Sequence, residues 1–251
     1  MSEPLSPGTP SPTPIRLVAL EDIDPEFAVD YHMHTSHTDG TASSRQMAES
    51  AASAGINEIL FSEHVRHTST YYPTFVDEIG CLRDSLEDLG MGIKVGIETK
   101  IMDTDGFLDC SEQIASLCDA IVGSVHRPPS DDQGNGRDWS DLDEPSALDL
   151  EFQLAMAIVT KSKAHILGHP MGMMVTRFNL QPLEHLYELA CACRTFDKAF
   201  ELNTRYCASP KDWIDVVSRA GCKVSFGSDA HRTADVGSAW HLFAEDRTTG
   251  S

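Results

Sequence analysis

The stretch DYHMHTSHTDG, residues 30–40, overlaps the end of an apolar segment at residues 27–33 and holds three histidines and two aspartates. His32 and His34 stand two positions apart, and in a strand such side chains point to the same side. Two neighbouring imidazoles make a poor core but a good pair of metal ligands. The stretch therefore predicts a strand that ends in a metal site, completed by ligands from elsewhere in the chain.

Downstream of this stretch, apolar segments alternate with segments that have helical spacing or helix caps. The predicted strands lie at residues 27–33, 56–64, 93–98, 119–126, 164–170, 198–204 and 222–231. The predicted helices lie at residues 43–55, 73–90, 111–118, 144–162, 182–197 and 209–221. This alternation implies parallel pairing with right-handed crossovers, and no early GxGxxG motif indicates a dinucleotide fold. The sequence predicts an α/β fold, a closed or nearly closed barrel.

The chain length of 251 residues suits a single domain of this class. Residues 1–14 are rich in proline and serine, so we expect a disordered tail there, and we expect a flexible tail at 246–251. The single domain is thus expected at 15–245. The amino terminus lacks the pattern of a signal peptide, and no apolar run reaches transmembrane length.

The charge and the cysteine content of the chain bear on its partners and its cellular location. Nineteen basic and 39 acidic residues give a formal net charge of 19 − 39 = −20, which disfavours nucleic acid and anionic membranes as partners. Seven scattered cysteines indicate reduced thiols and a cytoplasmic location rather than a disulfide framework. Cys191 and Cys193 fall in a helical pattern, where positions i and i+2 do not share a face, so we expect them in the core.

Residue types that bind metals stand at the carboxyl end of every predicted strand. They are His32, His34 and Asp39, Glu63 and His64, Glu98, His126, His169, Glu201 and Asn203, and Asp229 and His231. In a parallel barrel these ends line one mouth, where such folds keep their active sites. Any one of these residues could be an ordinary core, cap or turn residue, but together they would crowd half-buried polar groups that need partners. Metal cations satisfy that need.

Imidazoles and carboxylates without cysteine favour zinc, manganese or iron over magnesium or calcium. About nine ligands are too many for one ion that takes roughly four to six. The sequence therefore predicts two or three divalent ions.

The order of the motifs resembles that of the polymerase and histidinol phosphatase (PHP) family. DYHMHTSHTDG resembles the family's opening HxH…SDG signature, with HTDG in place of YSDG. SEHV stands where the family has a TDH-like motif, and GIE, GSVH, GHP, ELNT and GSDAH resemble the later motifs. The resemblance runs from Asp30 to His231 and implies a distorted (β/α)7 barrel, a TIM-like fold, with a trinuclear metal centre.

The resemblance also implies how nine ligands divide among three ions. The first ion would be held by His32, His34, Glu98 and Asp229, the second by the bridging Glu98 with His126 and His169, and the third by Asp39, His64 and His231. A hydroxide between two ions would attack phosphorus, while the third ion would stabilise the leaving group.

Catalysis further requires positive charge at the phosphate. Arg66, Arg127 and Arg205 lie just after ligand positions, and Arg127 is the first choice because it directly follows His126. We therefore expect these three arginines to act in catalysis together with Asp229 and His231. His37 and His67, in the first two loops, are candidates to protonate the leaving group.

Several functions suit such a site. The first is a metal-dependent phosphatase acting on a small phosphomonoester, resembling histidinol phosphatase. A phosphodiesterase or nucleotidase acting on nucleotides or nucleic acid ends is an alternative, disfavoured for polymers by the acidic charge. A non-catalytic scaffold is another, disfavoured by the full ligand set. Segments 66–74 and 127–143 are expected to shape the substrate pocket. The sequence does not indicate an oligomeric state.

Overall fold

The computed structural model describes residues 14–130 and 136–248. The expected amino-terminal tail, except Pro14, and residues 249–251 lie outside this range. The strands are β1 (Val18–Ala19), β2 (Val29–Met33), β3 (Glu58–His64), β4 (Gly92–Lys100), β5 (Ala120–Ser124), β6 (Ile166–Leu167), β7 (Ala199–Asn203) and β8 (Lys223–Gly227). The α-helices are α1 (Ser44–Ser53), α2 (Tyr72–Ser85), α3 (Glu112–Ala115), α4 (Glu144–Lys161), α5 (Gly172–Phe178), α6 (Leu183–Thr195), α7 (Pro210–Ala220) and α8 (Ser238–Thr248). Short 3-10 helices are η1 (Leu20–Asp22), η2 (Glu87–Leu89), η3 (Trp139–Asp141) and η4 (Thr233–Asp235).

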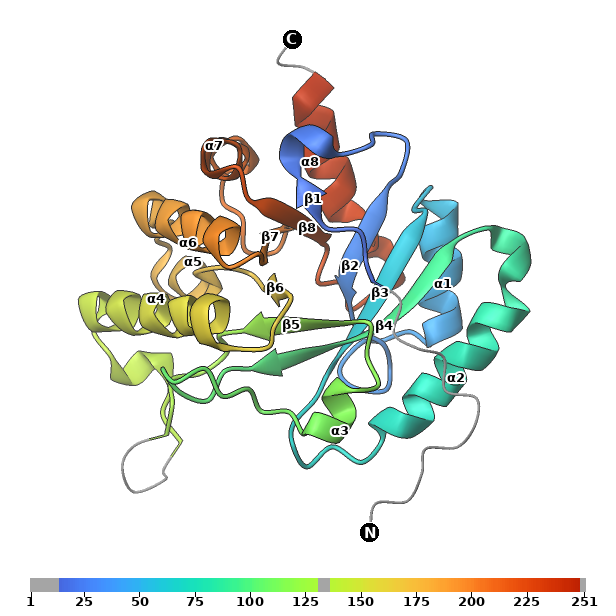
Figure 1. The fold of residues 1–251 in the computed structure, drawn as a ribbon, viewed down its shortest axis with the longest axis horizontal. Helices are drawn as coiled ribbons and strands as arrows, with labels where there is room; N and C mark the ends of the chain where they lie inside the picture. The colour runs from blue at the N-terminus through green and yellow to red at the C-terminus, as the bar shows by residue number, and fades with distance from the viewer. Residues whose placement is uncertain (1–13, 131–135, 249–251) are drawn as a thin grey trace.

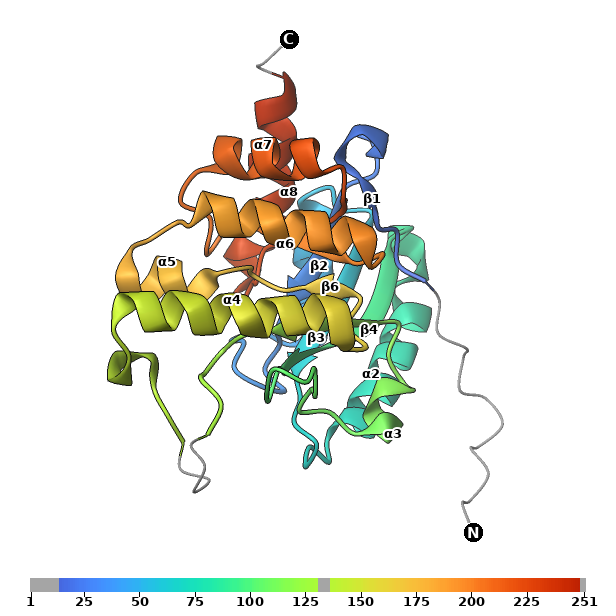
Figure 2. The same ribbon diagram turned by 60° about the vertical axis from the view of Figure 1, so that its left-hand side comes forward.

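The sheet has the order β1-β8-β7-β6-β5-β4-β3-β2. Strands β2 to β8 pair in parallel with their sequence neighbours, as the alternation of strands and helices predicted. Helices lie around the outside of the curled sheet (Figure 1), and α4, α6 and α7 stack along one side of it (Figure 2). The expected α/β barrel of seven parallel strands is confirmed, with the additional β1 paired antiparallel to β8.

The barrel is distorted where β2 meets the end of β8. The hydrogen-bonded ladder stays open at this seam, and a single parallel bridge joins Met33 to Ala230. The backbone N–H of His34 donates to the Ala230 carbonyl at 2.9 Å. The first and last ligand motifs of the sequence are therefore neighbours in space, although almost 200 residues separate them.

Asp30, the first residue of the quoted stretch, stabilises this seam from within β2. Its buried carboxylate accepts hydrogen bonds from the Ser228 N–H at 3.0 Å, the Ser228 hydroxyl at 2.6 Å and the Gly237 N–H at 2.8 Å. Burial raises the pKa of Asp30, and these hydrogen bonds oppose that shift. The aspartate that precedes the histidines is thus a structural tie between the two ends of the sheet.

Helix α7 illustrates how the outer layer packs on the sheet. Its buried residues, Trp213, Val216, Val217 and Ala220, recur at helical spacing, and the Trp213 ring lies 5.6 Å from that of Phe200 in β7. Since every residue of β7 is buried, the strand is covered on both faces. Polar side chains can then reach solvent only at the strand ends.

Among the strands and α-helices, β1, α5 and α8 were not predicted from the sequence. Two-residue β1 is too short to show a pattern, and α5 follows a turn in which Met171 has φ 56°. Helix α8 continues to Thr248, beyond the expected domain end at residue 245. Its Trp240 and Phe243 rings pack on Phe226 of β8, at 4.9 Å and 6.4 Å, which explains why this segment is helical.

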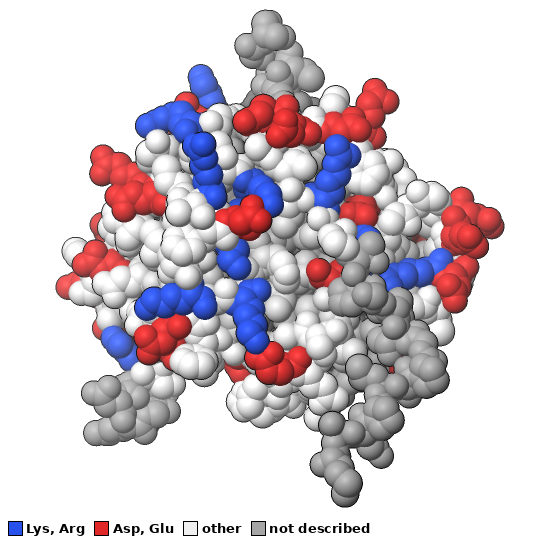
Figure 3. Space-filling model, in the orientation of Figure 1, with Lys and Arg blue, Asp and Glu red and all other residues white. Residues whose placement is uncertain are grey.

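All seven cysteines lie in the described part of the chain and are free, with Cys193 buried and Cys191 partly buried in α6. In residues 14–130 and 136–248, no helix has the length and apolar content needed to cross a membrane. Figure 3 shows acidic and basic side chains interspersed over one face, which presents no continuous basic surface there.

Candidate metal centre

Polar side chains from the carboxyl ends of the parallel strands converge on Glu98, near the end of β4. The strand ends bring together His32, His34 and Asp39 from β2 and its loop, His64 from β3, His126 after β5, His169 after β6, Glu201 and Asn203 from β7, and Asp229 and His231 after β8. The structure therefore brings all nine sequence-predicted ligands into one cluster.

Glu98 is the hub of this cluster. Its Oε1 atom lies 3.0 Å from Nε2 of His126 and 2.9 Å from Nε2 of His169. Its Oε2 atom lies 2.9 Å from Nδ1 of His64. Burial alone would raise the pKa of Glu98, but the imidazoles, first that of His126 and then those of His32 and His64, hold it well below its usual range. The carboxylate is thus negatively charged and shared by imidazoles on two sides.

The deepest part of the cluster contains His32 and His34, whose side chains are fully buried. Their Nε2 atoms lie 3.7 Å and 3.2 Å from Oδ1 of Asp229. Neither Nε2 atom has a hydrogen-bond partner among the described residues. A buried polar atom without a partner costs about 1–3 kcal/mol. A metal ion would satisfy both nitrogens and the Asp229 carboxylate at once, so these residues fit such an ion.

The outer part of the cluster is more exposed. Oδ2 of Asp39 lies 3.4 Å from Nε2 of His64 and 3.3 Å from Nε2 of His231. The rings of His34 and His64 stack with centroids 4.2 Å apart. Although burial opposes it, Glu98 and Asp39 raise the pKa of His64 to about 10. In the absence of a metal, the acids of the cluster thus hold a proton on this imidazole.

Three groups of ligand atoms are close enough to share an ion. They are His32, His34 and Asp229; His64, Glu98 and His126; and His34, Asp39, His64 and His231. His34 and His64 each belong to two of these groups, whereas the resemblance assigned only Glu98 to two ions. His169 is joined to the second group through Glu98 and through Nε2 of His126, at 3.3 Å.

Glu201 in β7 orients His32 and the backbone at His169 through hydrogen bonds. Its Oε1 atom accepts a hydrogen bond from Nδ1 of His32 at 2.6 Å, which leaves Nε2 of His32 free to face the cluster. Its Oε2 atom accepts from the backbone N–H of His169 and from the Asn203 side-chain amide at 3.2 Å. The sequence placed Glu201 and Asn203 at a strand end, and the structure places them against the histidines.

The loop that carries Asp39 is held by Glu63 in β3. The buried Glu63 carboxylate accepts hydrogen bonds from the Thr35 N–H at 2.7 Å and from the Thr38 hydroxyl. Gly40 closes this loop, because a Cβ there would lie between 2.5 and 2.8 Å from backbone atoms of His34 and Thr35. Any side chain at the glycine of the DG pair in the opening motif would therefore clash with the backbone of this loop.

Two ligand-type residues adopt left-handed backbone conformations, which cost about 1–3 kcal/mol for residues other than glycine. They are His169, with φ 26°, and Asp229, with φ 51°. After His169, buried Glu151 of α4 accepts hydrogen bonds from the N–H groups of Met173 and Met174, both at 2.9 Å. Glu151, which the sequence analysis missed within a helical pattern, therefore anchors the turn between β6 and α5.

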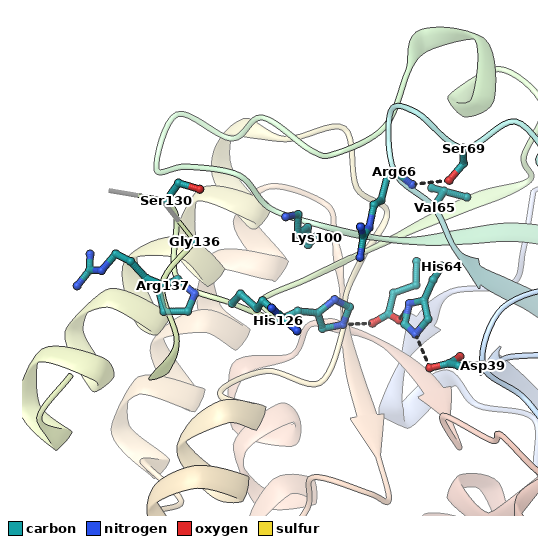
Figure 4. A pocket seen from close by; sticks show the side chains of 13 residues that line it. Asp39, His64, Val65, Arg66, Ser69, Lys100, His126, Ser130, Gly136 and Arg137 are labelled. Carbon is teal, nitrogen blue, oxygen red and sulfur yellow. Dashed lines mark hydrogen bonds and ion pairs between the residues drawn. The ribbon is translucent and has the colours of Figure 1, made fainter. Parts of the chain in front are cut away.

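Two adjoining cavities open onto the cluster, and Asp39, His64, Glu98 and His126 line both. The smaller has a volume of about 220 Å³ and is also lined by Arg205 and Tyr206. The larger, of about 600 Å³, lies beside the segments at 66–74 and 127–143, which both contribute lining residues (Figure 4).

The three arginines predicted from the sequence divide between these cavities. Nη1 of Arg205 lies 3.4 Å from Oδ2 of Asp229 and 3.2 Å from Nδ1 of His231, at the metal-ligand cluster. Arg66 and Arg127 line the larger cavity instead.

The two loop histidines pair with carboxylates that are not among the lining residues of these cavities. His37 bonds to Glu78 at 2.7 Å, and His67 bonds through Nδ1 to Asp109 at 2.7 Å. Neither histidine is among the residues that line the two cavities.

Comparison with known proteins relates this architecture to a family. Residues 30–205 match the PHP domain, and residues 214–250 match a family described as PHP-associated. A probable phosphatase from Enterobacter sp. (strain 638) is 26% identical over 222 residues, which cover 84% of this chain and 81% of the relative. The DNA polymerase/3'-5' exonuclease PolX of Bacillus subtilis is 26% identical over 69% of this chain, which spans only 28% of that relative's length.

Two solved structures share the fold. Histidinol phosphate phosphatase from Lactococcus lactis, complexed with zinc, L-histidinol and phosphate, is similar with a TM-score of 0.69 at 23% identity, covering 88% of this chain and 91% of that chain. A putative histidinol phosphatase from Listeria monocytogenes is similar with a TM-score of 0.69 at 16% identity, covering 86% and 99% of the two chains. At these identities the likeness concerns the fold.

Proposed function

The chain belongs to the PHP domain family, whose members are metal-dependent phosphoesterases, and from that premise we propose that it hydrolyses a small phosphomonoester at the Glu98 cluster. The observation that carries the proposal is the pair of buried Nε2 atoms of His32 and His34, which have no hydrogen-bond partner among the described residues and face the Asp229 carboxylate. Such an arrangement is costly without a cation and is explained by one.

We assign divalent ions of the zinc, manganese or iron type to the nine residues around Glu98. The deep group of His32, His34 and Asp229 would hold one ion, and Glu98 with His126 and His169 a second. Asp39 and His231 would hold a third ion. His64, which contacts both Asp39 and Glu98, would lie between the second and the third ion. When bound, such ions supply an activated water and positive charge for phosphate oxygens.

The protein's own residues would orient the substrate and the ligands. Arg205, beside Asp229 and His231, is placed to bind an oxygen of the phosphate that is removed, with the planar guanidinium geometry that suits phosphate. Glu201 would hold His32 in the tautomer that presents Nε2 to the ion. Arg66 and Arg127 would act on the substrate from the larger cavity.

Small substrates are favoured over nucleic acid by the net charge of −20. The free state of all seven cysteines supports a cytoplasmic location. Histidinol phosphate belongs in the substrate panel, because the similar Lactococcus lactis structure is that of a histidinol phosphate phosphatase.

The test combines metal analysis with a panel of phosphomonoesters and nucleotide phosphodiesters on the purified protein. We expect two to three bound divalent ions per chain, turnover of monoesters and loss of turnover with a chelator. Arg219→Gln, at an exposed ion pair with Asp215 in α7, is the control that should retain both metal and activity. Preferential hydrolysis of diesters would favour the phosphodiesterase, and bound metal without any hydrolysis would favour a scaffold.

A further inference from the structure

The larger cavity beside the metal-ligand cluster is lined by four basic residues. They are Arg66, Lys100, Arg127 and Arg137. The whole chain has only 19 basic residues against 39 acidic ones, so four in one cavity is a local reversal of its charge. The smaller cavity has a single basic residue, Arg205.

These basic residues come from three separate segments. Arg66 follows β3, and its backbone N–H donates to the Ser69 hydroxyl at 2.9 Å, which holds the turn. Lys100 ends β4 two positions after Glu98, so both side chains project from the same face of the strand. Figure 4 shows Arg66 extending between Lys100 and the His126–His64 wall, and Arg137 beside Gly136 with its guanidinium directed away from these residues.

Few carboxylates among the described residues balance this charge. In residues 14–130 and 136–248, the acids that line the larger cavity are Asp39 and Glu98, and both belong to the wall shared with the metal-ligand cluster. Lys100 has one further acidic neighbour, Asp109, at 3.8 Å, whereas no described carboxylate forms an ion pair with Arg66 or Arg127. Cations gathered without counter-charges repel one another, and an anionic ligand would relieve this repulsion.

A single phosphate cannot use all of these groups. Arg205 and the ions assigned to the cluster would surround the phosphate that is removed in the smaller cavity, which has about 220 Å³. The larger cavity, with about 600 Å³ and its own basic residues, has room for the remainder of the substrate. The charge of that remainder is then what Arg66, Lys100 and Arg127 would recognise.

We propose that the larger cavity is a second anion site, and that the substrate is a phosphomonoester whose remaining part carries a further phosphate or a carboxylate. This inference rests on the proposed phosphatase function and deepens it. An amino alcohol phosphate, whose remaining part is a cation, would be repelled by the same residues. Histidinol phosphate is such a compound, so it should be a poor substrate.

The test uses matched substrates with the metal-loaded enzyme. They are a butane-1,4-diol monophosphate with a free hydroxyl, the corresponding bisphosphate, 4-phosphooxybutanoate and 4-aminobutyl phosphate, together with their six-carbon homologues. We expect kcat/KM to be at least about tenfold higher for the anionic compounds than for the hydroxyl compound, mainly through KM, and lowest for the amine. The bisphosphate and carboxylate arms identify which anion the site prefers. Equal kcat/KM values for all four types would overturn the proposal.

Substitutions then locate the effect. Lys100→Gln and Arg127→Gln should each lower the ratio of kcat/KM between anionic and hydroxyl compounds about tenfold. Arg205→Gln should lower kcat/KM for all compounds alike and leave the ratio intact, and Arg219→Gln should change neither. If Lys100→Gln and Arg127→Gln reduced turnover of every compound equally, these residues would bind the phosphate that is removed, and the proposed second anion site would be overturned.

A binding measurement separates this inference from the phosphatase proposal. Butane-1,4-bisphosphonate and butylphosphonate, which cannot be hydrolysed, are titrated into the metal-loaded protein. We expect the bisphosphonate to bind at least about tenfold more tightly, with an advantage that falls as salt is raised. If no ester is hydrolysed, the phosphatase proposal fails while this titration still tests the anion site. Equal affinities for the bisphosphonate and butylphosphonate would overturn the proposed second anion site.

Discussion

The Oε1 atom of Glu201 lies 2.6 Å from Nδ1 of His32, and both side chains are fully buried. Through its other oxygen, Glu201 accepts the backbone N–H of His169, so one carboxylate braces two segments of the metal centre. Glu201→Gln would set an amide N–H against one of these donors. We expect metal affinity to fall about 10- to 100-fold while the fold persists. Competition with a chelator measures the affinity, and wild-type affinity in the variant would refute the bracing role.

His32→Ala and Asp229→Asn test the deep ligand group directly. Each change removes or weakens one ligand where Nε2 of His34 also lacks a partner. We expect phosphatase activity below detection and less bound metal per chain, with a circular dichroism spectrum like that of the wild type. Full activity in either variant would exclude that residue from the centre.

Metal loading should depend steeply on pH. The pKa of His64 in the metal-free cluster is raised to about 10 by Glu98 and Asp39 against the opposing effect of burial, so at neutral pH a proton must leave before this imidazole can bind an ion. Below pH 10, each unit of decrease should therefore weaken apparent zinc affinity by up to about tenfold per proton displaced. Titrations in buffers of different ionisation enthalpy would detect the released proton. An affinity that is constant between pH 6 and 9 (roughly the range a zinc titration tolerates) would contradict this prediction.

Glu151, which is not one of the nine candidate metal ligands, gives a pH effect on folding. Burial raises its pKa to about 7, against the opposing hydrogen bonds from Met173 and Met174. A carboxyl with a raised pKa in the folded state binds more protons when folded, so stability falls as pH rises from about 4.5 to 7. The loss in unfolding free energy reaches about 3 kcal/mol.

Glu151→Gln should remove this dependence, because the amide does not titrate. Urea unfolding of the metal-free protein at pH 5 and pH 8 would measure it, with exposed Glu188→Gln in α6 as the matched control. The prediction is wrong if wild type and Glu151→Gln lose the same stability over this range.

The seam of the barrel should be sensitive to Asp30. Asp30→Asn would place amide hydrogens against donors that now reach the carboxylate from Ser228 and Gly237. We expect a loss of about 2–4 kcal/mol in unfolding free energy, compared with about 1 kcal/mol for Ser228→Ala, which removes one hydroxyl. Urea denaturation would rank the two variants. A smaller effect for Asp30→Asn than for Ser228→Ala would contradict the tie across the seam.

Local patterns in the sequence determined the seven parallel strands and the polar residue types at their ends. This was possible because strand and helix periodicity, caps and motif order are properties of neighbouring residues. The same patterns did not reveal β1, α5 or α8. Helix α8 depends on the packing of Trp240 and Phe243 against Phe226, a contact with a strand earlier in the chain.

Tertiary structure decided how the strand-end residues meet. It made Glu98 the hub, placed His34 and His64 in overlapping groups, and separated Arg205 from the arginines of the larger cavity. Those relations depend on barrel curvature, on the bridge between Met33 and Ala230, and on left-handed turns at His169 and Asp229. They are set by distances between segments remote in sequence, which no local pattern encodes.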